Sequence, residues 1–163
     1  MIKLYKQTSN EGMRYHEAWL DDGQILEHWG QVGDKGESRS HAIASEEDED
    51  DEESLLEHVL APARQGGFNP IADDELHALT LEYLVDGFGS DHDRRKRGAL
   101  MARLDQTLGW TGLGHCDGGS VGSGSMEVVC LVVDYDTARR VIEADLRGTE
   151  YGDYERIYEE EAE

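Results

Sequence analysis

The feature that most constrains the fold of this chain is a continuous apolar run from Met126 to Val133, which reads MEVVCLVV. β-Branched residues dominate it, and such residues fit the pleated surface of a sheet better than they fit a helix. An apolar run of this length is typical of a strand that is covered on both faces. We therefore predict a well-buried strand at this position.

The segments before this strand show one strand pattern and one helix pattern. Leu79, Leu81, Tyr83 and Val85 alternate with other residues, as on one face of a strand, and the pattern stops at Asp86-Gly87. A helix is predicted between Asp91 and Leu108, because its leucines recur at helical spacing up to the stop signal Gly109.

The segments after the run repeat this alternation. Asp134 or Asp136 is expected to cap a helix that ends near Gly148, and a last strand is expected over Tyr154–Tyr158, followed by a frayed acidic tail. If Gly112–Asp117 pairs with the run at Met126, the order becomes β-α-β-β-α-β, which is the ferredoxin-like arrangement. We assign this α+β module to residues 74–160.

The N-terminal part is predicted to be a small antiparallel sheet followed by one helix. Residues 1–43 alternate between apolar and polar side chains, and Asp21-Asp22-Gly23 is a hairpin signal. An acidic run, 46–53, precedes a helix over Ser54–Arg64 that ends at Gly66-Gly67. Turn formers and acidic residues follow Phe68, so the first domain is placed at 1–70, with 46–53 as an acidic insert.

The charge of the chain limits its partners. Its 163 residues include 37 acidic and 15 basic side chains, for a formal net charge of -22. This charge opposes the phosphate neutralisation that drives non-specific binding to nucleic acid, and it favours encounter with basic surfaces. Apolar runs are too short to cross a membrane and two cysteines are few for a secreted scaffold, so we expect a cytoplasmic protein with reduced thiols.

The segment from Tyr15 to Phe68 resembles the WGR domain, a module of poly(ADP-ribose) polymerases and of bacterial proteins. The resemblance rests on Trp29-Gly30, Val32-Gly33 and Gly36, and then on the helix that ends at Gly66-Gly67-Phe68. It implies DNA-end sensing or interdomain contact. Gln31 stands where the family has an arginine, and it carries no charge for a phosphate.

The C-terminal part is similar to a piece found in uncharacterised bacterial proteins joined to WGR-like segments, through Gly109-Trp110-Thr111-Gly112 and His115-Cys116-Asp117-Gly118-Gly119. This second resemblance implies no activity.

The glycine-rich stretch from Gly109 to Gly124 has two interpretations. Seven glycines would allow a phosphate to approach the backbone, but the stretch contains no lysine and matches neither the P-loop nor the dinucleotide motif. It is expected to be a flexible hairpin loop at a sheet edge, and a ligand- or partner-binding loop is the alternative. His58 and His77, elsewhere in the chain, are expected to be packed against apolar segments.

The group His115-Cys116-Asp117 is not expected to hold a metal or to act as a nucleophile. Zinc prefers four donors at characteristic spacing, and neighbouring residues on a strand point to opposite faces. Acidic residues are so abundant that no acid–base pair stands out. We therefore predict a protein without catalytic residues, metal or cofactor.

The sequence thus favours a non-enzymatic, acidic, immunity- or regulator-like protein that binds a basic protein partner through 46–53 and the tail from Glu155 onward. The alternative is a nucleic-acid-binding WGR module that uses a basic patch of Lys3, Lys6, Arg14, Lys35 and Arg39. The candidate binding residues are Trp29, Gly30, Gln31, Lys35, Arg39, Trp110, His115, Asp117, Ser120 and Ser123.

Overall fold

The computed structural model describes residues 1–43 and 51–161, and it divides the chain into two compact units, Met1–Ile71 and Ala72–Glu163. Each unit contains one four-stranded antiparallel sheet, and the described residues include three α-helices. The predicted α+β class is confirmed. Within the described residues, none of the helices has the length and apolar character needed to span a membrane.

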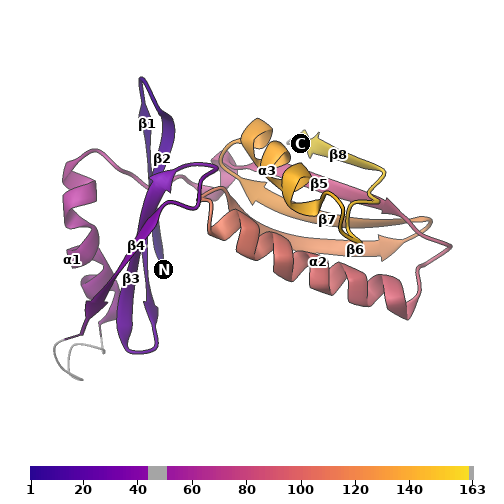
Figure 1. The fold of residues 1–163 in the computed structure, drawn as a ribbon, viewed down its shortest axis with the longest axis horizontal. Helices are drawn as coiled ribbons and strands as arrows, with labels where there is room; N and C mark the ends of the chain where they lie inside the picture. Colours follow the sequence, from indigo (N-terminus) through magenta and orange to yellow (C-terminus); the bar gives the residue numbers. More distant parts are fainter. Residues whose placement is uncertain (44–50, 162–163) are drawn as a thin grey trace. The chain divides into compact units, whose positions relative to one another are not determined.

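The sheet of the N-terminal unit is a simple meander (Figure 1). Its strands are β1 (Ile2–Thr8), β2 (Gly12–Asp21), β3 (Gln24–Gln31) and β4 (Glu37–Ala42), paired in chain order. Asp22 and Gly23 join β2 to β3 with positive φ angles of 46° and 73°. A two-residue turn with positive φ at both positions is typical of β-hairpins, because its twist matches the twist of the flanking strands. The predicted hairpin turn is therefore confirmed.

Helix α1 (Glu52–Gln65) covers one face of this sheet. Its first turn is capped by Asp51, whose carboxylate accepts a hydrogen bond from the Ser54 amide. Leu56 and Leu60 pack against Leu4 and Ile25 of the sheet to form the core. Of the acidic run 46–53, residues 46–50 lie outside the described residues, and 51–53 form the beginning of this helix, where carboxylates favour the positive end of the helix dipole.

The C-terminal unit has the element order β-α-β-β-α-β after a short 3-10 turn, η2 (Asp73–Glu75). Its elements are β5 (His77–Leu84), α2 (Asp91–Gly109), β6 (Gly114–Gly122), β7 (Ser125–Val132), α3 (Tyr135–Leu146) and β8 (Arg156–Glu160). The sheet order is β6-β7-β5-β8, and each neighbouring pair is antiparallel.

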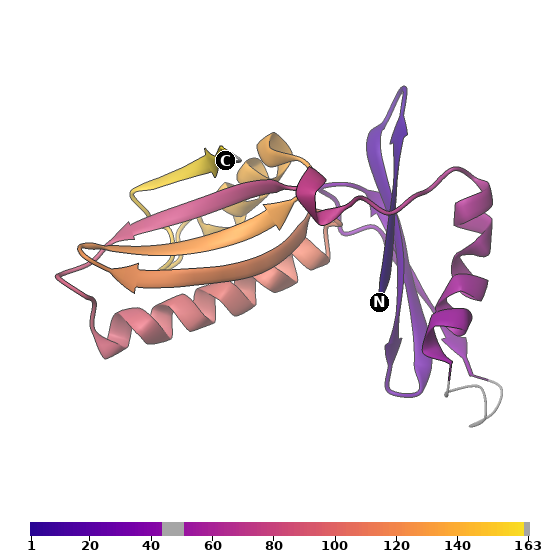
Figure 2. The same ribbon diagram turned by 180° about the vertical axis from the view of Figure 1, so that it is seen from behind.

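Helices α2 and α3 lie on the same face of this sheet (Figures 1 and 2). The opposite face, which carries neither of these two helices, is here named the open face. The two helices are joined by Arg103, which donates to the carboxylate of Asp145 at 3.0 Å. Leu100, Leu104 and Leu108 of α2 are fully buried. The helical spacing predicted from these leucines is therefore confirmed.

Strand β7 is an interior strand, but it is not buried equally on its two faces. Met126, Val128, Cys130 and Val132 are buried beneath the helices, whereas the alternate residues on the open face are partly exposed. The prediction of a well-buried strand is confirmed for the face beneath the helices and not for the open face, because the helices of this unit cover only one face of the sheet.

Two further predictions about this unit are wrong. The glycine-rich stretch was expected to be a flexible loop, but most of it is a strand, because Gly114–Gly122 forms the edge strand β6, which pairs with β7. Only Ser123 and Gly124 form the turn between the two strands. The acidic tail does not fray at Tyr158, because β8 continues through Glu159 and Glu160, paired with β5.

Candidate functional site

A surface hollow lined mainly by carboxylates lies where β8 ends beside the start of β5. Antiparallel pairing places Ala78 opposite Glu160, and η2 lies immediately before β5 in the chain. The hollow, here named the acidic hollow, is lined by Asp74, Glu75, Leu76, His77, Ala78, Glu159, Glu160 and Glu161.

Local contacts hold several of these carboxylates in place. Glu159 accepts from Nδ1 of His77 at 2.6 Å, and Glu160 accepts from the hydroxyl of Thr80 at 3.0 Å. Glu75 accepts from the Ala72 amide at 3.3 Å. Each carboxylate keeps further acceptor capacity, and a guanidinium can bind a carboxylate with two parallel hydrogen bonds. The hollow is therefore chemically suited to lysine or arginine side chains.

The sequence identified only part of this hollow. The tail from Glu155 onward is a predicted contact surface, but Asp74, Glu75 and His77 are not among the predicted site residues. His77 and His58 are both exposed, so the prediction that they are packed is wrong. His77 follows a charged turn, and it meets Glu159 only through the pairing of strands that lie far apart in the sequence.

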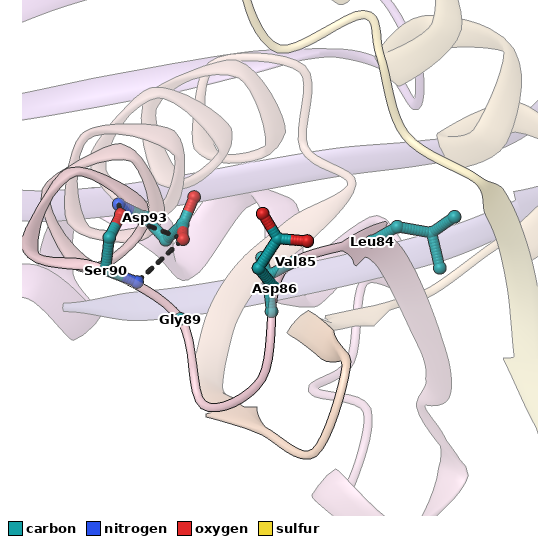
Figure 3. Close-up of a pocket in the computed structure, with 6 residues that line it drawn as sticks. All are labelled: Leu84, Val85, Asp86, Gly89, Ser90 and Asp93. Carbon is teal, nitrogen blue, oxygen red and sulfur yellow. Dashed lines mark hydrogen bonds between the residues drawn. The ribbon is translucent and has the colours of Figure 1, made fainter.

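A second hollow, at the start of α2, is explained by helix capping (Figure 3). Asp93 accepts from the amide of Ser90 at 2.7 Å, and the Ser90 hydroxyl accepts from the Asp93 amide at 3.1 Å. These two bonds form a capping box. The hydrogen bonds from Ser90 lower the pKa of Asp93, so this carboxylate already has its structural partners.

Trp29 lies on the face of the N-terminal sheet that also carries α1, in a polar cluster that the sequence did not reveal. Its ring stacks on His16 at 5.7 Å, and the guanidinium of Arg39 lies 5.5 Å from its ring centre. Beside it, Glu27 accepts from His16 at 2.8 Å, from His41 at 2.7 Å and from Arg39 at 2.8 Å. The register in which β2, β3 and β4 pair places the side chains of this cluster next to one another on one face of the sheet.

Glu27 is the anion at the centre of this cluster and is only 4% exposed. Burial raises its pKa, but the hydrogen bonds from Arg39, His41 and His16 outweigh burial and lower the pKa to about 2. The cluster is therefore an ionised carboxylate that is hydrogen-bonded by one guanidinium and two imidazoles.

The other residues of the WGR-like motif have structural contacts. A Cβ atom at Gly30 would lie 2.8 Å from Gly36 and 3.0 Å from the hydroxyl of Tyr15, so glycine permits this close approach. Gln31 is exposed and donates to the carbonyl of Glu11 at 2.6 Å. Lys35 is exposed in the turn after β3, and its carbonyl lies 2.5 Å from Nε2 of His28.

Four of the five residues of the predicted basic patch, Lys3, Lys6, Arg14 and Arg39, already have acceptors. Lys3 pairs with Glu17 at 3.7 Å, and Arg14 pairs with Glu11 at 2.9 Å. Lys6 donates to the carbonyl of Gly66 at 2.7 Å. Because β-strand neighbours face opposite sides, Lys3 also lies on the other face from Lys6, Arg14 and Arg39.

The candidate residues of the C-terminal unit are spread along β6 and its ends. Trp110 follows α2, is 41% exposed and donates to Gln106 at 3.2 Å. His115 and Ser120 lie on the open face, opposite Leu131 and Glu127. Asp117 is the bulged residue between Cys116 and Gly118, and Ser123 is in the β6–β7 turn. The structure does not bring these residues into one site.

Among the described residues, no group of three or more histidine, cysteine or acidic side chains is arranged to hold a metal ion. Comparisons with family models, with curated proteins and with solved structures found no match for this chain.

Proposed function

We propose that this protein is a non-enzymatic, acidic binding protein whose partner is a basic protein. The acidic hollow carries the proposal, because five carboxylates and a single imidazole line one concave surface. The net charge of -22 adds a long-range field that attracts a basic partner. Complementary charge speeds encounter and selects against acidic partners.

The mechanism that fits this surface is occlusion of a basic patch on the partner. Lysine or arginine side chains of the partner enter the acidic hollow, and the surrounding acidic surface covers the patch. A protein that acts in this way resembles an immunity protein or a regulator, and the cytoplasm is the compartment we propose for it.

The topology supports a finer description of the two units. The element order β-α-β-β-α-β with sheet order β6-β7-β5-β8 fits a ferredoxin-like module. The meander followed by α1, with Trp29 and Gly30 in β3, fits a WGR-like module. Nucleic acid receives less support as a partner, because Lys3, Lys6, Arg14 and Arg39 already have acceptors.

The test is capture of partners from nuclease-treated native lysate by the tagged full-length chain and by two variants. The first carries Glu159→Gln, Glu160→Gln and Glu161→Gln, in which each amide retains an acceptor oxygen for its local hydrogen bond. The matched control removes the same charge elsewhere through Asp21→Asn, Glu37→Gln and Glu150→Gln. All three carboxylates of the control are exposed and outside the hollow.

We expect the wild type and the control to retain a basic protein that elutes with salt, and the hollow variant to lose most of it. Equal retention by both variants would contradict a role for the hollow. The wild type is also tested in a parallel capture from lysate that has not been treated with nuclease, and recovery of nucleic acid alone from that lysate would favour the WGR alternative.

A further inference from the structure

The two cysteines of the chain form a directly opposed pair on neighbouring strands. Cys116 of β6 is the register partner of Cys130 of β7, so both side chains point to the same face of the sheet. Opposed residues on antiparallel strands have Cα atoms about 4.5–5.5 Å apart. Disulfides form across Cα separations of about 4.4–6.8 Å. The backbone therefore already has the spacing of a disulfide.

The two thiols differ in access and in acidity. Cys130 is fully buried, whereas Cys116 is partly exposed on an edge strand. A hydrogen bond from the Cys130 thiol and another from the Gly118 amide lower the pKa of Cys116, against the opposing effects of burial and of nearby Asp105 and Asp117. The same thiol–thiol bond and burial raise the pKa of Cys130. Cys116 is thus the more reactive thiol.

The backbone around Cys116 is fixed by contacts on both sides of the residue. Its amide donates to the carboxylate of Asp105 on α2 at 3.1 Å, and its sulfur lies 3.6 Å from the carbonyl of Val129. The bulge at Asp117 begins immediately after it. These contacts hold the sulfur of Cys116 against β7 and beside the sulfur with which it would react.

We propose that Cys116 and Cys130 are a redox site, at which a peroxide converts the dithiol into a disulfide between β6 and β7. The Cys116 thiolate attacks one peroxide oxygen, so that an S–O bond forms, the O–O bond breaks and hydroxide leaves, taking up a proton to become water. The sulfur of Cys130 then attacks Cys116, forming the S–S bond and releasing the sulfenic oxygen as a second water with the Cys130 proton. Two thiols are oxidised and one peroxide is reduced, and a thiol reductant reverses the reaction.

This site is independent of the proposed binding function. The acidic hollow is formed by η2, β5 and the end of β8, whereas the cysteine pair joins β6 to β7. The reaction needs neither a partner protein nor a bound cofactor, so it can be measured on the isolated full-length chain.

The test compares disulfide formation in the folded chain with that in the same chain unfolded in guanidinium, at equal and low hydrogen peroxide. Non-reducing peptide mapping by mass spectrometry detects the linked pair, and dimedone traps sulfenic acid. In the folded chain we expect an intramolecular Cys116–Cys130 link at least tenfold faster than in the unfolded chain, reversed by dithiothreitol.

Two variants assign the roles of the two sulfurs. Cys130→Ser is expected to accumulate dimedone-labelled Cys116, because the attacking sulfur is absent, whereas Cys116→Ser is expected to leave Cys130 unlabelled, because it is buried. The proposal is overturned if the folded wild type links its cysteines no faster than the unfolded chain, or if Cys116 proceeds to sulfinic acid without forming the link.

Discussion

Replacing Glu27 by glutamine tests whether the carboxylate beside Trp29 stabilises the N-terminal unit as an ion. Glu27 is 4% exposed and accepts hydrogen bonds from His16, Arg39 and His41. Lowering its pKa from 4.5 to about 2 corresponds to roughly 3 kcal/mol of stability in the ionised folded state. We expect Glu27→Gln to lower the free energy of unfolding by about 2–3 kcal/mol at pH 7, because the amide keeps the shape and loses the charge.

The stabilisation by Glu27 should decrease as the pH is lowered. Because the folded pKa lies below the unfolded one, the contribution of Glu27 is fully present above about pH 4.5 and is lost as the pH falls through about 2. The difference between wild type and variant should therefore shrink from neutral pH toward pH 2.

The assay is urea unfolding followed by tryptophan fluorescence. Trp110→Phe in every protein leaves Trp19 and Trp29 as reporters of the N-terminal unit. Glu37→Gln, at an exposed position of the same sheet, is the control and should change stability by less than about 0.5 kcal/mol. A difference between wild type and Glu27→Gln that stayed constant from pH 7 to pH 2 would refute the argument from ionisation.

Four further outcomes are expected. Gly36→Ala should destabilise the N-terminal unit by about 2 kcal/mol or more in urea unfolding, because φ is +64° and the added Cβ would lie 2.1 Å from the carbonyl oxygen of Trp29. Gly124→Ala, with φ +87° and no atom within 4 Å, should destabilise the C-terminal unit by only about 1 kcal/mol, and equal losses would contradict the steric argument. Oxidation of Cys116 and Cys130 should raise the unfolding free energy of the C-terminal unit by about 2–3 kcal/mol, and unchanged stability would indicate a strained link. Affinity of the captured partner should fall steeply with salt for the wild type and less steeply for the hollow variant, as titration calorimetry can measure, and parallel slopes would exclude the hollow from the contact.

Local periodicity was sufficient to predict most of the elements. The leucines of α2 repeat at helical spacing, and Leu79, Leu81 and Tyr83 alternate along β5, so one buried face is visible in the sequence for each. Caps were also visible, since Asp134 accepts from the Thr137 amide as an N-cap residue should.

Prediction failed where long-range pairing overrides local composition. The glycines of β6 have weak strand preference, and only the register with β7 explains why the segment is extended. At Gly119 an added Cβ would lie 2.6 Å from the carbonyl of Glu127, so this glycine allows close packing of strands. A high glycine content was therefore a poor indicator of a loop here.

The candidate sites were the hardest part to predict, because each is assembled from distant segments. His77 meets Glu159, and His16 meets Glu27, only once the strands have paired. The sequence contains each residue but no local pattern that relates them. The acidic tail could be predicted from its charge alone, whereas the hollow that it forms with η2 and β5 could not.

The strand order of the two sheets sets different constraints on folding during synthesis. The N-terminal meander pairs each strand with the one made just before it, so β1 to β4 can assemble as they leave the ribosome. In the C-terminal unit, the central strand β5 is made first, and its neighbours β7 and β8 come later, with β8 ending at Glu160. One edge of β5 therefore stays unpaired until β7 is made, and the other until β8, the last strand, is available. Ribosomal stalling before β8 would leave one edge of an apolar strand open to pairing with another chain, a route to aggregation that the N-terminal meander avoids.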